Sequence, residues 1–192
     1  MNTASQVQIS AETTPNPNTL KFVVNKTFFE FGSMDFPDKE KAQESPLASK
    51  LFDIPSVAGV FIGTNFITVT KTTEADWNTL ITPVVNTIRA LLSTGEAVTG
   101  TGKNTETKAE GAGAKAADPV ETKIREILDR EIRPAVAMDG GDIVFLKYED
   151  GVVTLHLRGS CSACPSSVMT LKMGVENRLK AEVPGVKEVV QV

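Results

Sequence analysis

The sequence predicts an α+β fold: two small α+β domains joined by a flexible linker. Residues 96–117 contain repeated glycines and almost no large apolar side chains, so they cannot bury enough surface to offset the entropy of ordering. On both sides of this segment, apolar residues at helical spacing alternate with short strand-like runs. A chain of 192 residues is also long enough for two domains. We predict domains at 10–95 and 118–192.

The first predicted domain mixes strands and helices. Ser45 followed by Pro46 is typical of a helix start, while Pro83 should kink the last helix or mark its first turns. The expected elements are a strand at 20–24 with a partner at 28–31, a helix at 45–52, a hairpin of strands 57–62 and 66–70, and a helix at 77–92.

The second predicted domain has the clearer pattern. Asp118 before Pro119 indicates a helix N-terminus, and Pro134 followed by the Asp139-Gly140-Gly141-Asp142 run indicates its end. The expected order is a helix at 118–132, a strand hairpin at 143–148 and 152–158, a loop with two cysteines, a helix at 165–183 and a strand at 186–192.

Composition excludes several classes of protein. The net charge is −4 and no basic cluster occurs, which argues against nucleic-acid binding. The apolar runs are shorter than the roughly 18–20 residues that span a bilayer, so no membrane partner is expected. Residues 1–6 lack the apolar and arginine-rich patterns of leader peptides. Two cysteines do not make a disulfide framework, and we therefore predict a reducing, cytoplasmic location.

The only two cysteines, Cys161 and Cys164, lie in a Gly-Ser-Cys-Ser-Ala-Cys-Pro segment between a predicted strand and helix. The positive end of that helix should lower the thiol pKa and favour thiolate, which metal binding and redox exchange both require. Tetrahedral zinc and iron–sulfur clusters usually take four protein ligands. One chain offers two thiols and one histidine, so a metal site needs a second chain, an outside thiol or open positions. A disulfide between the two cysteines needs none of these.

Blander interpretations remain for these and other residues. The two cysteines could simply be small buried side chains. His156 is expected to be a solvent-facing strand residue, and the Asp139–Asp142 run a glycine helix cap rather than a cation site. The serines around the cysteines fit helix capping better than hydrogen bonding to sulfur.

Three motifs in 118–192 together resemble the NifU-like C-terminal module of Nfu-type iron–sulfur proteins. They are Asp-Gly-Gly-Asp-Ile from Asp139, Gly-Ser-Cys-Ser-Ala-Cys-Pro-Ser-Ser from Gly159, and Thr170-Leu171-Lys172 followed by Val175-Glu176. The Thr-Pro-Asn-Pro-Asn-Thr-Leu-Lys-Phe run from Thr14 resembles the opening of the Nfu N-terminal domain.

The resemblance implies a scaffold or carrier rather than an enzyme. Cys161 and Cys164 would bind a 4Fe–4S cluster shared between two chains, although a 2Fe–2S cluster also accepts four thiolates. The implied partners are apo iron–sulfur proteins as acceptors, the upstream assembly machinery and a second copy of the chain. A thioredoxin-like thiol–disulfide oxidoreductase and a zinc-bridged dimer are the alternatives.

Overall fold

The computed structural model describes residues 7–29, 32–94, 98, 118–162 and 165–192, without the side chains of 165–171. The chain divides into two compact units on either side of residues 99–117, and each unit mixes helices with strands. The predicted α+β class with two domains is therefore confirmed. The predicted linker, 96–117, lies outside the described residues except for Val98, and the predicted domain bounds stay predictions.

The first unit is built on a five-stranded antiparallel sheet with strand order β1-β2-β5-β4-β3. Its strands are β1 (Ile9–Thr13), β2 (Thr19–Val24), β3 (Met34–Phe36), β4 (Val57–Ile62) and β5 (Phe66–Lys71). The predicted β4–β5 hairpin is confirmed. The predicted partner for β2 is wrong: β2 pairs with β1 and β5, and Phe28 and Phe29 are not in a strand. An edge strand such as β1, with four of its five residues exposed, lacks the apolar alternation that identifies strands.

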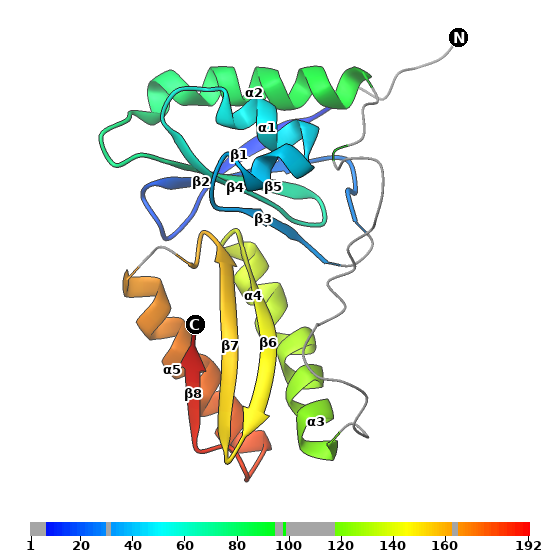
Figure 1. The fold of residues 1–192 in the computed structure, drawn as a ribbon, viewed down its shortest axis with the longest axis vertical. Coiled ribbons are helices and arrows are strands. Elements are labelled where there is room, and N and C mark those ends of the chain that lie inside the picture. Colours follow the sequence, from blue (N-terminus) through cyan, green and yellow to red (C-terminus); the bar gives the residue numbers. More distant parts are fainter. Residues whose placement is uncertain (1–6, 30–31, 95–97, 99–117, 163–164) are drawn as a thin grey trace. The chain divides into compact units, whose positions relative to one another are not determined.

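The described residues of the first unit also form a short 3-10 helix (Lys41–Glu44) and two α-helices, α1 (Pro46–Phe52) and α2 (Trp77–Thr94). The Ser45 hydroxyl caps α1 by accepting a hydrogen bond from the Ala48 amide at 3.1 Å. Pro83 lies inside α2, and the helix continues through it. Figure 1 shows both helices on the same face of the sheet. They bury a shared core of side chains that includes Phe22, Phe36, Leu47, Ile67 and Ile88.

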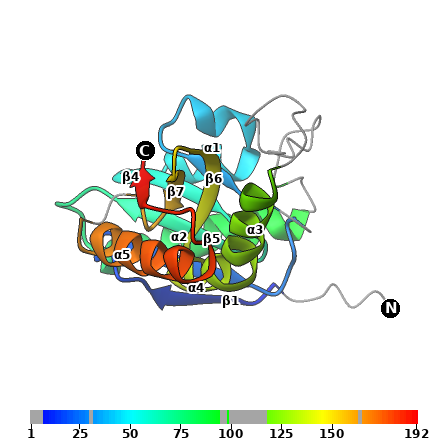
Figure 2. The ribbon, with the colours of Figure 1, turned by 90° about the horizontal axis from the view of Figure 1, so that it is seen from below.

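The second unit has a three-stranded sheet with order β6-β7-β8. Its strands are β6 (Gly141–Glu149), β7 (Val152–Gly159) and β8 (Glu188–Gln191). Strands β6 and β7 form an antiparallel hairpin, and β8 runs parallel to β7 after the crossover helix α5 (Pro165–Glu182). Figure 2 shows α5 on the same side of this sheet as the helical segment 119–138, which precedes β6. Among the described residues, no helix combines the length and apolar character needed to cross a membrane.

The helical segment before β6 is longer than predicted. It consists of α3 (Pro119–Ile127), a π-helical turn (Leu128–Ile132) and α4 (Arg133–Met138). The predicted helix start is confirmed, because Asp118 accepts a hydrogen bond from the Val120 amide at 2.9 Å. The predicted end at Pro134 is wrong. Pro134 lies in the first turn of α4, directly after the π-helical turn, and the helical segment continues through it to Met138.

Alternation along the β6–β7 hairpin places one set of side chains in the core. Ile143 pairs with Leu157 and Phe145 with Leu155, and all four are buried. They pack with Ile124, Ile127, Val175 and Leu179 of the helices. The core also includes Cys161, the first of the two predicted ligands.

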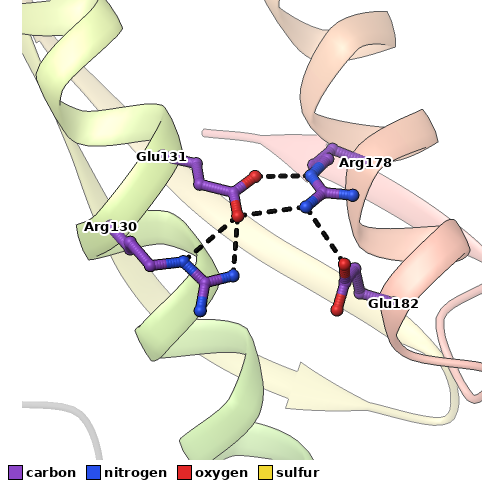
Figure 3. A network of polar contacts seen from close by, with 4 residues as sticks. All are labelled: Arg130, Glu131, Arg178 and Glu182. Atoms are coloured by element: carbon purple, nitrogen blue, oxygen red, sulfur yellow. Dashed lines mark hydrogen bonds and ion pairs between the residues drawn. The ribbon is translucent and has the colours of Figure 1, made fainter.

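An ion-pair network joins the π-helical turn to α5 (Figure 3). Arg178 donates two hydrogen bonds to Glu131, at 2.5 and 3.0 Å, and lies 3.0 Å from Glu182. Arg130 donates to the same Glu131 carboxylate. These hydrogen bonds, that of Arg178 first, lower the pKa of Glu131 from 4.5 to about 2. The network therefore ties together two helical segments that are far apart in the sequence.

The network predicts a pH dependence. A carboxylate with a lowered folded-state pKa stabilises the fold above its unfolded pKa and loses that contribution as pH falls through the folded value. At pH 6 the parent chain should therefore have a higher free energy of unfolding than Glu131→Gln. This difference should shrink as the pH falls from 4.5 to about 2. Urea unfolding followed by the NMR signals of Tyr148, the only tyrosine, reports on this unit. Glu126→Gln, on exposed α3 surface, is the matched control and should show no such loss.

Candidate functional site

Cys161 lies in a tight turn directly after β7. The turn begins at Gly159, whose φ of +67° is left-handed and favours glycine. The Gly159 carbonyl accepts hydrogen bonds from the Ser162 amide at 3.2 Å and the Ser162 hydroxyl at 2.8 Å. The amide and the hydroxyl of Ser162 thus both bind the Gly159 carbonyl and stabilise the turn, and the hydroxyl acts as that of a capping residue does.

The cysteine turn also bonds to the chain that precedes β6. The Ser160 amide donates to the Gly140 carbonyl at 3.2 Å, and Gly141 pairs with Gly159 at the end of the hairpin. Ser160 and Cys161 are only 2% and 3% exposed. The structure covers the Cys161 side chain with the core of its own unit, which agrees for this cysteine with the interpretation as a small buried side chain.

Arg133 and Asp142 fix the start of β6 beside this turn. Arg133 Nε donates to Asp142 Oδ1 at 2.9 Å, and the Ile143 amide donates to the same oxygen at 2.8 Å. Arg133 also binds Asp129, one helical turn earlier, at 2.8 Å. Neither Arg133 nor Gly141, which the Cys161 side chain approaches closely, was among the residues predicted from the sequence to belong to the site. The repeated glycines and acids of the Asp139–Asp142 run were the only available signal for them.

Cys164, the second predicted ligand, lies outside the described residues. The residue that follows it, Pro165, begins α5 as predicted. Further along α5, Glu176 accepts hydrogen bonds from Lys180 and from the Val189 amide of β8, at 2.5 and 3.0 Å. Both bonds, that of Lys180 first, lower the pKa of Glu176. This position of the Val175-Glu176 motif therefore anchors the last strand to the helix.

The remaining candidate residues have structural roles. His156 is half-buried on β7, and its Nδ1 lies 2.7 Å from the Val192 carbonyl oxygen. Asp139 ends α4, and Gly140 follows it with a φ of +81°, so the helix-cap interpretation of this run is confirmed. Within the described residues, no three or more histidine, cysteine or acidic side chains are grouped so that they could hold a metal ion.

Comparison with known protein families gives two matches. Residues 9–95 match the family described as scaffold protein Nfu/NifU N terminal. Residues 124–190 match the NifU-like domain. Each match falls within one of the two compact units. These are the two modules that the motifs of this sequence resemble.

Curated relatives extend over both modules. The chain is 45% identical over 185 residues to the human protein named NFU1 iron-sulfur cluster scaffold homolog, mitochondrial, covering 96% of this chain and 71% of the human protein. It is 42% identical to the protein of the same name from Drosophila sechellia, covering 96% of this chain and 64% of that one. The chain thus spans about two thirds of the length of these relatives.

Two solved structures are similar to parts of the chain. A NifU-like protein from Saccharomyces cerevisiae, studied by solution NMR, is 28% identical with a TM-score of 0.47, and the match covers 53% of this chain and 92% of that one. A crystal structure of a protein from Staphylococcus aureus is 24% identical with a TM-score of 0.38, and the match covers 42% and 98%.

The two α+β units and their family matches define a two-domain protein with an Nfu N-terminal domain and a NifU-like domain. In the second domain, a cysteine turn leads from the sheet into a helix. With 45% identity to the human relative across 96% of its length, the chain belongs to the NFU1 iron–sulfur cluster scaffold family. The family named from the sequence motifs is confirmed.

The predicted cytoplasmic location is wrong. The relatives are named mitochondrial, which points to mitochondria rather than to the predicted cytoplasmic location. The prediction rested on the low cysteine content and on the lack of leader-peptide patterns in residues 1–6. A low cysteine content argues only against an oxidising compartment and does not separate one reducing compartment from another.

Proposed function

We propose that this chain is a scaffold and carrier that binds an iron–sulfur cluster as cargo between two copies of itself and passes it to apo-proteins. Cys161 and Cys164 supply the ligands, and the cluster is of the 4Fe–4S type. The observation that carries the proposal is the donor set. The chain has two cysteines, both in one segment between β7 and α5, and such clusters are commonly held by four thiolates. Two chains together complete the set.

The local structure supports this role in two ways. The cysteine segment leads into α5, an 18-residue helix, and the amide groups at a helix N-terminus favour anionic ligands. Main-chain hydrogen bonds and the left-handed φ of Gly159 fix the conformation of the turn at 159–162. Its two ends, Gly159 and Ser162, are bonded to each other, and Cys161 lies between them. Binding requires the turn to present a sulfur that is covered in the described conformation.

Transfer to other proteins follows from the sharing of the cluster. A cluster held between two chains is released when the chains separate, and an acceptor with four cysteines of its own then offers the better ligand set. The proposed partners are therefore apo iron–sulfur proteins, the machinery that loads the cluster, and a second copy of the chain. No catalytic turnover is part of the proposal.

A thiol–disulfide oxidoreductase stays the second candidate because of one observation. Strand β7, helix α5 and strand β8 form a parallel β-α-β unit with the cysteines at its strand-to-helix connection. A Cys-x-x-Cys pair near such a unit is also typical of thioredoxin-like proteins. The names of the relatives favour the scaffold.

Anaerobic reconstitution of the full chain tests the proposal. After loading with ferrous iron and sulfide, about four iron and four sulfide ions per two chains are expected for a 4Fe–4S cluster, and about two of each for a 2Fe–2S cluster. Mixing the loaded chain with an apo-ferredoxin should move the cluster to the acceptor, as followed by visible circular dichroism. A colourless chain that holds zinc, or one that reduces insulin and binds no iron, contradicts the proposal.

A further inference from the structure

The sulfur of Cys161 packs directly against the main chain of Gly141. A methyl group built on Gly141 would lie 2.9 Å from Cys161 Sγ and 3.2 Å from Cys161 Cβ. It would also lie 2.7 Å from the main-chain carbonyl oxygen of Arg158. Carbon atoms in folded proteins do not approach this closely without displacement. Only glycine leaves the room that the Cys161 side chain occupies.

The surroundings of this contact are held from both sides. Strand pairing holds Gly141 opposite Gly159, and the Gly140 carbonyl bonds to the Ser160 amide. Asp142, next to Gly141, is anchored by Arg133. A methyl group at Gly141 would meet the main-chain carbonyl of Arg158, which belongs to β7, and the side chain of Cys161, which follows the end of that strand. A side chain yields more readily than the main chain of a paired strand, so the sulfur is the group expected to move.

The contact also covers the sulfur. Cys161 is 3% exposed and belongs to the apolar core that contains Ile143 and Leu157. A thiol in this position is inaccessible to alkylating and oxidising reagents unless the turn opens, because such reagents act on accessible thiolate.

We infer that Gly141 is the positioning residue for Cys161: the missing side chain of Gly141 lets the sulfur lie covered against β6 until the 159–162 turn presents it. The inference rests on the proposed function, in which Cys161 is a cluster ligand. It adds a residue outside the cysteine motif that controls whether this ligand is covered or accessible.

The test measures alkylation of Cys161 by N-ethylmaleimide in the full chain, with Cys164→Ser as the parent so that one thiol remains. In the folded parent, Cys161 should react at least about a hundredfold more slowly than in the same chain unfolded in guanidinium chloride. Adding Gly141→Ala should raise the folded-state rate at least about tenfold, because the new methyl group displaces the sulfur from its covered position. The alkylation rate of this variant should not change when low concentrations of urea are added. A rate that required global unfolding would rise with urea, so a constant rate identifies displacement of the sulfur in the folded chain.

Gly151→Ala is the matched control. A methyl group at Gly151 would lie 2.8 Å from the Lys187 side chain and 2.9 Å from the Gly185 carbonyl oxygen, at the opposite end of the same hairpin. This variant creates a similar steric conflict in the same unit but does not touch the cysteine turn. Without urea, Cys161 in this variant should therefore be alkylated at the same rate as in the parent. A folded parent within about threefold of the unfolded rate, or a Gly141→Ala variant as protected as the parent, overturns the inference.

If Gly141→Ala does not fold, Cys161→Ala is added to it. Removal of the sulfur should then restore part of the free energy of unfolding, and a double variant as unstable as Gly141→Ala alone overturns the assignment. None of these readouts depends on bound cluster. If Cys161 is protected in the Cys164→Ser parent but the chain with both cysteines never takes up iron and sulfide, the proposed function alone is contradicted.

Discussion

Replacing either Cys161 or Cys164 with serine is expected to abolish stable cluster binding and leave both units folded. The chain has no third cysteine that could take the place of the missing ligand, and a serine hydroxyl is a poor ligand for iron where a thiolate is preferred. Iron bound after reconstitution should fall below about one tenth of the parent value in each single variant. Iron and sulfide analysis gives this measurement directly, and far-ultraviolet circular dichroism checks the fold.

Ser162→Ala is the control for this pair of variants. The Ser162 hydroxyl bonds to the Gly159 carbonyl within the same turn, so its removal disturbs the turn without removing a thiol. This control should keep most of the parent's iron. A cysteine variant that binds as much iron as the parent sinks the ligand assignment, while a loss of iron in all three variants points to the shape of the turn rather than to the ligands.

Cluster loading is expected to convert the chain from a monomer, or a weakly associating species, into a dimer with one cluster for two chains. The physical reason is ligand number: two chains, each with two thiolates, complete a four-thiolate set. A two-fold axis through the site brings two identical turns together. Light scattering on paired loaded and cluster-free samples, with iron counted per chain, measures both quantities together.

Dilution supplies the control for this second prediction. A cluster held between chains should be lost as chain concentration falls, because binding and assembly are linked by mass action. A cluster held within one chain should be insensitive to dilution. A loaded monomer that carries a full four-iron cluster without added thiol contradicts the shared site.

The helix and hairpin signals of the sequence agree with the structure wherever the interaction is local. The caps at Ser45 and Asp118 depend on hydrogen bonds between residues two or three positions apart, and the β4–β5 hairpin depends on the residues of its own turn. Such contacts leave a signal within a few residues. The edge strand β1 leaves none, because its side chains are mostly exposed and its hydrogen bonds depend on β2.

Residue types and spacing predicted the α+β class and singled out the cysteine pair, and the resemblance of the motifs to Nfu-type proteins predicted the family. The covering of Cys161 was decided by tertiary structure, since it depends on strand pairing that brings Gly141 to Gly159. The same is true of the Glu131–Arg178 pair, which joins residues 47 positions apart. Contacts between distant segments form only when the sheet and helices pack. Residue patterns within a short stretch of sequence therefore do not reveal which distant groups meet.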